Sequence, residues 1–224
     1  MRSLFNVRPA VPASEEFLRV QDEYLKTENE SRGITDIADL TPIFGNLYLW
    51  RGDITTLKVG AIVNAANSAM TGCYVPCHAC IDNCIHTFSG VQLRAFCDAI
   101  IKKQGHEEKT GGAKITPSFN LPCDFVIHTV GPIISGTLRE SDCKLLESCY
   151  KNCLDIAEKN GVKSIAFCCI STGVFRFPAK NAAQIAVSAV QKWQNQTKSA
   201  MKIVFNVFSE KDEAIYKAIF KEIL

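Results

Sequence analysis

Short, nearly continuous apolar segments alternate with amphipathic ones along most of the chain, and this alternation limits the possible folds more than any other feature. An unbroken apolar strand is typical of a sheet that is covered on both faces. Strands that alternate with helices indicate a layered α/β domain with a mixed, mostly parallel sheet. The predicted strands are residues 47–55, 61–67, 124–130, 164–170 and 202–208, and the predicted helices are residues 91–105, 141–161, 179–196 and 211–224.

The beginning of the chain has a different pattern. Apolar residues recur at roughly helical spacing over residues 15–33, and Gly33 provides a stop signal. A second, short helical piece is expected around residues 36–40. We therefore expect residues 1–45 to form an N-terminal helical extension that packs on a main domain of residues 46–224.

Composition argues against several classes of function. The net charge of +2 over 224 residues is too weak to indicate nucleic-acid binding, and no apolar run is long enough to cross a bilayer. The first residues lack the continuous apolar stretch of a secretory signal, so the eleven cysteines indicate free thiols in a reducing compartment. We expect a cytoplasmic monomer without a nucleic-acid or membrane partner.

Polar residues follow the carboxyl ends of the predicted strands, where open α/β sheets bind ligands. Asp53 follows the first strand, and Asn64 and Asn67 end the second. By residue type alone, Asp53 could cap a turn or bind an adenine amino group, and the asparagines could cap a loop or recognise sugar hydroxyls. Residues 171–178 (STGVFRFP) could form an ordinary turn or cradle a phosphate with backbone amides.

The stretch GCYVPCHACIDNCIH holds four cysteines, two histidines and an aspartate within fifteen positions. Thiolate and imidazole suit zinc, and closely spaced pairs are typical of residues that share one ion. Several ligand triples are possible by spacing, among them Cys73, His78 and Cys80 on one short loop. Three protein ligands leave a position open for catalysis, whereas a fourth ligand, Cys84 or His86, would close a structural site.

Three further residues need an interpretation, two within this stretch and one beyond it. Asp82 lies beside the candidate ligands, where a carboxylate could orient or deprotonate a water; it could also cap the following helix. Cys77 is an extra thiol without an assigned role. His128 lies within an apolar strand and is expected to be a satisfied core histidine, not a ligand.

Taken in order, the motifs WRGDIT, AIVNAANSAM, CIDNCIH, TGGAKIT, FVIHTVGP and STGVFRFP resemble those of the macrodomain family. The resemblance runs from about Leu47 to the C-terminus and implies a three-layer α/β/α fold with a mixed central sheet that binds ADP-ribose. A Cys/His loop stands where the family usually has glycines after the NAAN motif. This replacement, together with the N-terminal extension, resembles the zinc-dependent branch of the family, whose members remove mono-ADP-ribose from proteins.

The resemblance implies a role for each matching residue. It implies that Cys73, His78 and Cys80 bind Zn²⁺, and that Asp82 and Asn67 take part in catalysis. The implied ADP-ribose contacts are Asp53 and the Ile54 amide for adenine, Asn64 and Asn67 for the distal ribose, Ser171, Thr172, Gly173, Val174 and Phe175 for the pyrophosphate, and Phe208 for adenine.

Three functions are compatible with these motifs. The resemblance implies a zinc-dependent hydrolase that removes mono-ADP-ribose from modified protein side chains, with an ester to Asp or Glu as the expected bond. The alternative is a non-catalytic ADP-ribose-binding module in which Cys84 or His86 closes a structural zinc site. The third is a partner-binding module in which the Cys-rich loop only shapes a surface, and it leaves the NAAN and STGVF motifs unexplained.

Overall fold

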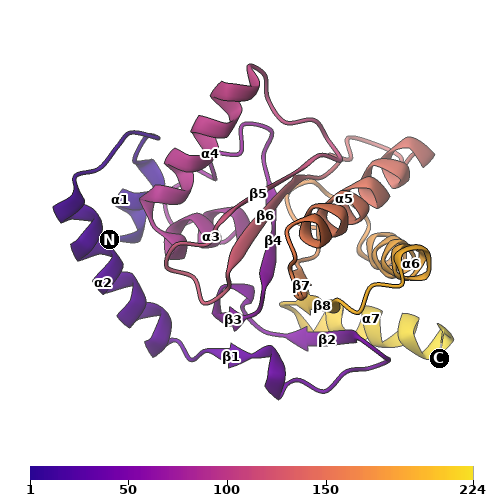
Figure 1. Cartoon of the computed structure of the whole chain (residues 1–224). Coiled ribbons are helices and arrows are strands. Elements are labelled where there is room, and N and C mark those ends of the chain that lie inside the picture. Colours follow the sequence, from indigo (N-terminus) through magenta and orange to yellow (C-terminus); the bar gives the residue numbers. More distant parts are fainter. Residues whose placement is uncertain (224) are drawn as a thin grey trace.

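A mixed sheet of six strands forms the centre of the computed structural model, which describes residues 1–223 (Figure 1). The strand order is β2-β8-β7-β4-β6-β5, and neighbours are parallel except for β5, which runs antiparallel to β6. The strands are β2 (Leu47–Arg51), β4 (Ala61–Ala66), β5 (Ala113–Pro117), β6 (Phe125–Val130), β7 (Ser164–Phe167) and β8 (Lys202–Val207). Two shorter strands, β1 (Thr35–Asp36) and β3 (Leu57–Lys58), pair with each other outside this sheet.

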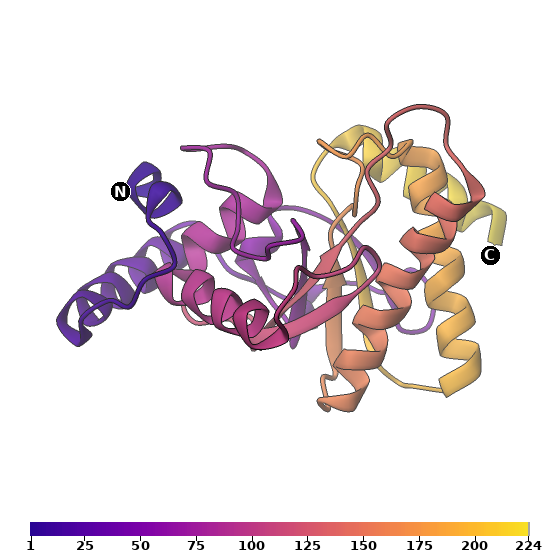
Figure 2. The same cartoon turned by 90° about the horizontal axis from the view of Figure 1, so that it is seen from above.

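Helices cover both faces of the sheet and complete three layers. Figure 2 shows α3 and α4 on one side and α5, α6 and α7 on the other, so the predicted α/β/α fold with a mixed sheet is confirmed. The helices are α1 (Arg2–Val7), α2 (Glu15–Ser31), α3 (Ile81–Ser89), α4 (Val91–Gln104), α5 (Glu140–Lys159), α6 (Ala179–Thr197) and α7 (Glu210–Ile223), with short 3₁₀ turns η1 (Ile37–Asp39) and η2 (Ile54–Thr56).

The central strands are apolar because helices cover both of their faces. All four residues of β7 are buried, and five of the six residues of β4 are. Ile62 and Val63 are completely inaccessible to solvent, and so is Ile165 on the neighbouring strand. This burial explains why the apolar runs predicted these strands correctly.

Helix α1 and the strands β1, β3 and β5 were not predicted. Helix α1 has six residues, too few for a helical periodicity to be visible in the sequence. Strand β5 has five residues and ends at Pro117, which is tolerated because β5 is at the edge of the sheet. The helix expected over residues 15–33 is present as α2, and the short helical piece expected around residues 36–40 is η1.

Helix α2 is attached to the main domain by buried polar side chains. The side-chain amide of Asn29 donates to the backbone carbonyls of Asn120 (2.7 Å) and Phe88 (3.2 Å). The Gln21 side chain accepts from the backbone N–H of Val91 (2.9 Å), at the first residue of α4. Over the described part of the chain, no helix has both the length and the apolar character needed to cross a membrane.

Candidate active site

The candidate site lies at the carboxyl edge of the sheet, beside the end of β4. Strand β4 is flanked by β6 and β7, both parallel to it, so the loops that follow these strands meet at one edge. The chain leaves β4 at Ala66, passes Asn67, and returns through the Cys/His loop into α3. Residues far apart in the sequence therefore converge there.

Cys73, His78 and Cys80 form a compact group of ligands. One ligand atom from each lies within 4.8 Å of the other two, and Cys73 Sγ is 3.7 Å from His78 Nδ1. All three residues are half-buried. A tetrahedral zinc ion with ordinary Zn–S and Zn–N lengths holds a sulfur and a nitrogen about 3.5 Å apart. The three residues therefore fit a zinc ion.

Cys80 has a second role, because it begins α3. It is the N-cap residue, and its Sγ accepts from the backbone N–H of Asn83 (3.4 Å). Burial, with the neighbouring Cys73 thiol, raises the pKa of Cys80 to about 12, although the Asn83 N–H acts in the opposite direction. The interpretation of Asp82 as the cap is therefore wrong: Asp82 lies in the first turn of α3, after the cap.

The two residues considered as a fourth ligand lie elsewhere. Cys84 Sγ accepts from the guanidinium of Arg2 (3.3 Å) and is not grouped with the three ligands among the described residues. His86 lies in the core, 4% exposed, where its ligand atom comes within 4.8 Å of those of Cys97 and His128. Burial lowers the pKa of His86 well below its ordinary value, so the ring is neutral.

Asp82 lies in the first turn of α3, two residues after the ligand Cys80, and is 6% exposed. Its Oδ1 accepts from Asn64 Nδ2 (2.8 Å), and its Oδ2 accepts a longer bond from Asn67 Nδ2 (3.4 Å). The Asn67 amide also donates to the Gly72 carbonyl (3.0 Å), which ties the NAAN segment to the start of the Cys/His loop. Burial raises the pKa of Asp82 to about 6, whereas the Asn64 hydrogen bond acts in the opposite direction. Such a carboxyl group is well suited to exchange a proton near neutral pH.

Asn64 connects Asp82 to the core. The residue is completely buried, and its Nδ2 also lies 3.1 Å from His128 Nδ1. Because this amide donates to Nδ1, the proton of the neutral His128 ring is on Nε2, which lies 3.0 Å from Thr116 Oγ1. The expectation of a satisfied core histidine is confirmed for His128. The ribose contact of Asn64 stays a prediction, and in the structure its amide nitrogen faces Asp82 and His128.

His128 makes the stability of the fold sensitive to acid. Burial lowers its pKa from 6.5 to about 3, so its contribution is fully present above pH ~6.5 and is lost as the pH falls toward 3. Over pH 7 to 4 this loss amounts to about 3 kcal/mol. Between pH 7 and pH 4, we expect the free energy of unfolding to fall by about 3 kcal/mol less in His128→Gln than in the unmodified chain. Urea unfolding at both pH values measures this difference. His86, also held neutral by burial, stays in the variant, and exposed His106→Gln is the control. If the free energy of unfolding falls equally between pH 7 and pH 4 in His128→Gln and in the unmodified chain, His128 is not the source of the acid sensitivity.

The loop after β7 is tightly folded and carries an unpaired hydroxyl. Ser171 and Arg176 bracket it with left-handed backbone conformations (φ 65° and 58°), and the Ser171 carbonyl accepts from the N–H of Phe177 (3.0 Å). Ser171 Oγ is buried and has no hydrogen-bond partner among the described residues. Within the loop, Thr172 and Phe175 are half-buried, whereas Gly173 and Val174 are exposed. The exposed tip leaves backbone groups accessible to a ligand.

A second loop lies against this one. The N–H of Ile134 donates to the Phe175 carbonyl (2.9 Å). A Cβ atom at Gly131 would meet Ser171 Oγ and would come within 2.9 Å of the Ile170 side chain. Only glycine therefore permits the observed contact between the two loops.

The predicted adenine residues lie at the far strands of the same edge. Asp53 begins η2, and its carboxylate accepts from the N–H of Thr55 (2.9 Å) and pairs with Arg32 from the end of α2. Ile54 follows with a buried side chain. Phe208 comes directly after β8 and is 79% exposed, so its ring is accessible to a ligand.

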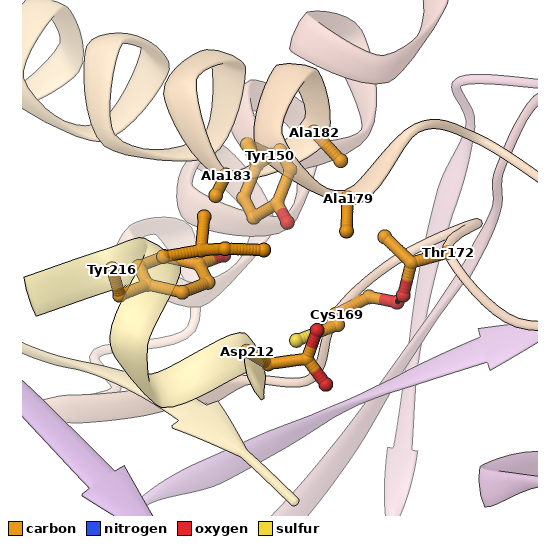
Figure 3. Close-up of a pocket in the computed structure, with 9 residues that line it drawn as sticks. Tyr150, Cys169, Thr172, Ala179, Ala182, Ala183, Asp212 and Tyr216 are labelled. Atoms are coloured by element: carbon orange, nitrogen blue, oxygen red, sulfur yellow. Dashed lines mark hydrogen bonds between the residues drawn. The ribbon is translucent and has the colours of Figure 1, made fainter. Parts of the chain in front are cut away.

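A small cavity adjoins the loop after β7. Figure 3 shows its lining: Asp212 and Cys169 lie next to each other, with Tyr150 above them, Tyr216 to the left and Thr172 to the right. Its volume of about 10 Å³ has room for one water molecule and not for a nucleotide. The cavity is therefore too small to be the nucleotide site.

Several residues that shape the site were missed by the sequence analysis. Arg32 holds Asp53, and Arg2 and Asn6 of α1 contact the Cys/His loop. Each lies 21 to 82 residues from the groups that it contacts. No local pattern connects positions so far apart, so the sequence held no signal for these contacts.

Comparison with known proteins agrees with this architecture. Residues 63–186, more than half of the chain, match the family model described as Macro domain. A Treponema medium protein named protein-ADP-ribose hydrolase is 66% identical over 223 residues, covering 98% of this chain and 85% of that protein. A protein of the same name from Staphylococcus aureus (strain MSSA476) is 51% identical over 221 residues, covering 98% of this chain and 83% of that protein.

A solved structure extends the likeness to the fold. The crystal structure of the Trypanosoma brucei macrodomain in complex with ADP-ribose is similar with a TM-score of 0.74 at 29% identity, over 97% of this chain and 94% of that chain. Sheet order, loop positions and sequence similarity lead to the same conclusion: this chain belongs to the macrodomain family.

Proposed function

We propose that this chain is a zinc-dependent hydrolase that releases mono-ADP-ribose from modified protein side chains. The observation that supports it most directly is the convergence of Cys73, His78 and Cys80 beside the buried carboxyl group of Asp82. The names of the Treponema medium and Staphylococcus aureus relatives support the same class of activity. All eleven cysteines are free, which suits the reducing cytoplasm in which we place this enzyme as a monomer.

The three ligand residues would hold the zinc ion, with the fourth position open. When bound, zinc acts as a Lewis acid and makes a bound water easier to deprotonate. Asp82, fixed by the amides of Asn64 and Asn67, would orient the attacking water and accept its proton. The expected bond is an ester to Asp or Glu, because a carboxylate is a weak base and leaves more readily than the nitrogen or hydroxyl groups of other side chains.

The rest of the edge would bind the nucleotide and thereby position the bond to be cut. Backbone amides of Ser171–Phe175 would hold the pyrophosphate, and Phe208 would pack on adenine. Asp53, held by Arg32, would accept from the adenine amino group, with the Ile54 amide assisting. Binding energy realised at the adenine and pyrophosphate would then hold the distal ribose beside Asp82.

The proposal is tested by measuring ADP-ribose release from a protein modified on carboxylates. The assay compares the native chain, the chain after metal removal, and the stripped chain after zinc is restored. We expect release to disappear with the metal and to return with zinc, while circular dichroism shows that the stripped protein stays folded. A zinc-loaded chain that binds ADP-ribose and releases none would instead support the non-catalytic module or a different linkage.

The contact between the two loops predicts a specific effect on ligand binding. Gly131→Ala places a methyl group against Ser171 Oγ and displaces the loop after β7. We expect ADP-ribose affinity, measured by calorimetry, to fall about tenfold, which corresponds to about 1.4 kcal/mol.

A matched control is available in the neighbourhood of Gly131. A Cβ at Gly136 would meet nothing within 4 Å, so Gly136→Ala should bind ADP-ribose like the unmodified chain. Equal affinities for Gly131→Ala and Gly136→Ala would show that this loop does not hold the ligand.

A further inference from the structure

Helix α1 lies against the segment that carries the three candidate zinc ligands, beside α3 (Figure 1). Asn6, near the end of α1, is 1% exposed and uses both ends of its side-chain amide. Its Oδ1 accepts from the backbone N–H of Cys77 (2.8 Å), and its Nδ2 donates to Thr87 Oγ1 on α3 (2.9 Å). One buried side chain thus connects the ligand loop to the helix that follows it.

Arg2 contacts the same loop from the first turn of α1. Its guanidinium donates to the His78 carbonyl (2.8 Å) and to Asn83 Oδ1 (3.0 Å). The Asn83 amide in turn donates to the carbonyls of Val75 (2.9 Å) and Cys73 (3.3 Å). The backbones of two ligand residues, Cys73 and His78, are therefore connected to α1 and α3 by polar side chains.

Arg94 of α4 joins α1 to the loop from the other side. The buried guanidinium donates to the Asn6 carbonyl (2.8 Å) and to the Arg8 carbonyl, at the C-terminal end of α1. It also lies under the ring of Tyr74, 4.1 Å from the ring centroid. Tyr74 belongs to the ligand loop, so the loop and α1 share this anchor.

The loop needs such support because its own backbone is irregular. It has no helix or strand between Cys73 and Cys80. Cys77 adopts a left-handed conformation (φ 54°), which is strained for a non-glycine residue and persists only when the surrounding structure imposes it. The N–H that Asn6 accepts is that of Cys77 itself. Asn6 therefore holds the strained residue that directly precedes the ligand His78.

We propose that α1 is an integral part of the metal site and that Asn6 is a positioning residue that sets its zinc affinity. Asn6 keeps the ligand loop in the shape that brings Cys73 Sγ and His78 Nδ1 to 3.7 Å. This inference rests on the metal site of the proposed function. It assigns to the N-terminal extension a role in metal binding in addition to packing.

The test is the zinc affinity of Asn6→Ala, measured in the full chain by competition with a chromophoric chelator. Partners that orient metal ligands typically contribute 10- to 100-fold to affinity, and we expect a loss of about that size. Arg2→Ala should weaken zinc binding several-fold. Because Arg2 is more exposed than Asn6, this variant still tests the inference if Asn6→Ala does not fold. Amide exchange gives a second measurement: the Cys77 N–H should exchange faster in Asn6→Ala.

Asn29→Ala is the matched control. Asn29 is the same residue type in the same extension and is 3% exposed. Its side chain also bonds the backbone of the main domain, but the carbonyls that accept from it, those of Phe88 and Asn120, lie outside the ligand loop. We expect its zinc affinity and Cys77 exchange to match the unmodified chain. Unchanged affinity in both Asn6→Ala and Arg2→Ala overturns the inference, and so does an equal loss in Asn6→Ala and Asn29→Ala. An unmodified chain that binds no zinc refutes the metal site itself, and the inference with it.

Discussion

Replacing Cys80 with serine is expected to lower the rate of ADP-ribose release about a thousandfold, a change of about 4 kcal/mol in the activation barrier. A hydroxyl is a far poorer zinc ligand than a thiolate, so the variant should lose the metal. Serine is also a favoured N-cap residue, and its hydroxyl can accept from the Asn83 N–H as Cys80 Sγ does. The helix that follows should therefore remain folded.

Two measurements separate loss of metal from loss of fold in Cys80→Ser. Initial rates of release from a carboxylate-modified protein give the activity, and metal analysis by mass spectrometry gives the zinc content. Cys143→Ser, a half-buried position on α5, should stay within about twofold of the unmodified chain. A metal-free Cys80→Ser protein with full activity would exclude zinc from the reaction.

Asp82→Asn is expected to lower the turnover number at least about 100-fold, because a positioned acid–base group contributes 10²- to 10⁴-fold. The amide keeps the shape of the carboxylate, and its Oδ1 can still accept from Asn64 Nδ2, 2.8 Å away in the native chain. It cannot take a proton from water. ADP-ribose affinity, measured by calorimetry on the same preparation, should change little.

The matched control for Asp82→Asn is Asp98→Asn. Asp98 lies on α4 and pairs with Lys102 at the surface, so its removal should leave turnover unchanged. Turnover of Asp82→Asn equal to that of the control would make Asp82 a structural carboxylate. A loss confined to ADP-ribose affinity would make it a ligand contact without a role in the chemical step.

The layers of the fold were predictable because burial on both faces leaves a direct mark on composition. The runs around Ile62 and Ile165 are apolar since helices cover both sides of the sheet there. Strand β5 leaves no such mark, because three of its five residues are only half-buried and one is exposed. Helix α1 was missed for a different reason, since six residues span fewer than two turns.

The candidate site was predictable where its residues are neighbours in the chain. Cys73, His78 and Cys80 lie within eight positions, and Asp82 lies two residues further on. Spacing alone left several ligand triples open, and the structure brings together this one. It also places Cys84 against Arg2, and His86 in the core, which no spacing rule distinguishes from a ligand position.

By itself, the sequence determined five of the six strands of the central sheet, all except β5, and it placed a group of candidate metal-binding side chains on one short loop. Both are local properties, expressed in hydropathy and in spacing over a few residues. Only the tertiary structure decided how that loop is held. Asn6 reaches Cys77 across 71 positions, and Gly131 lies against Ser171 from another loop. Such contacts depend on the packing of whole helices and strands, because the chain between the partners can be arranged in many ways until the core forms.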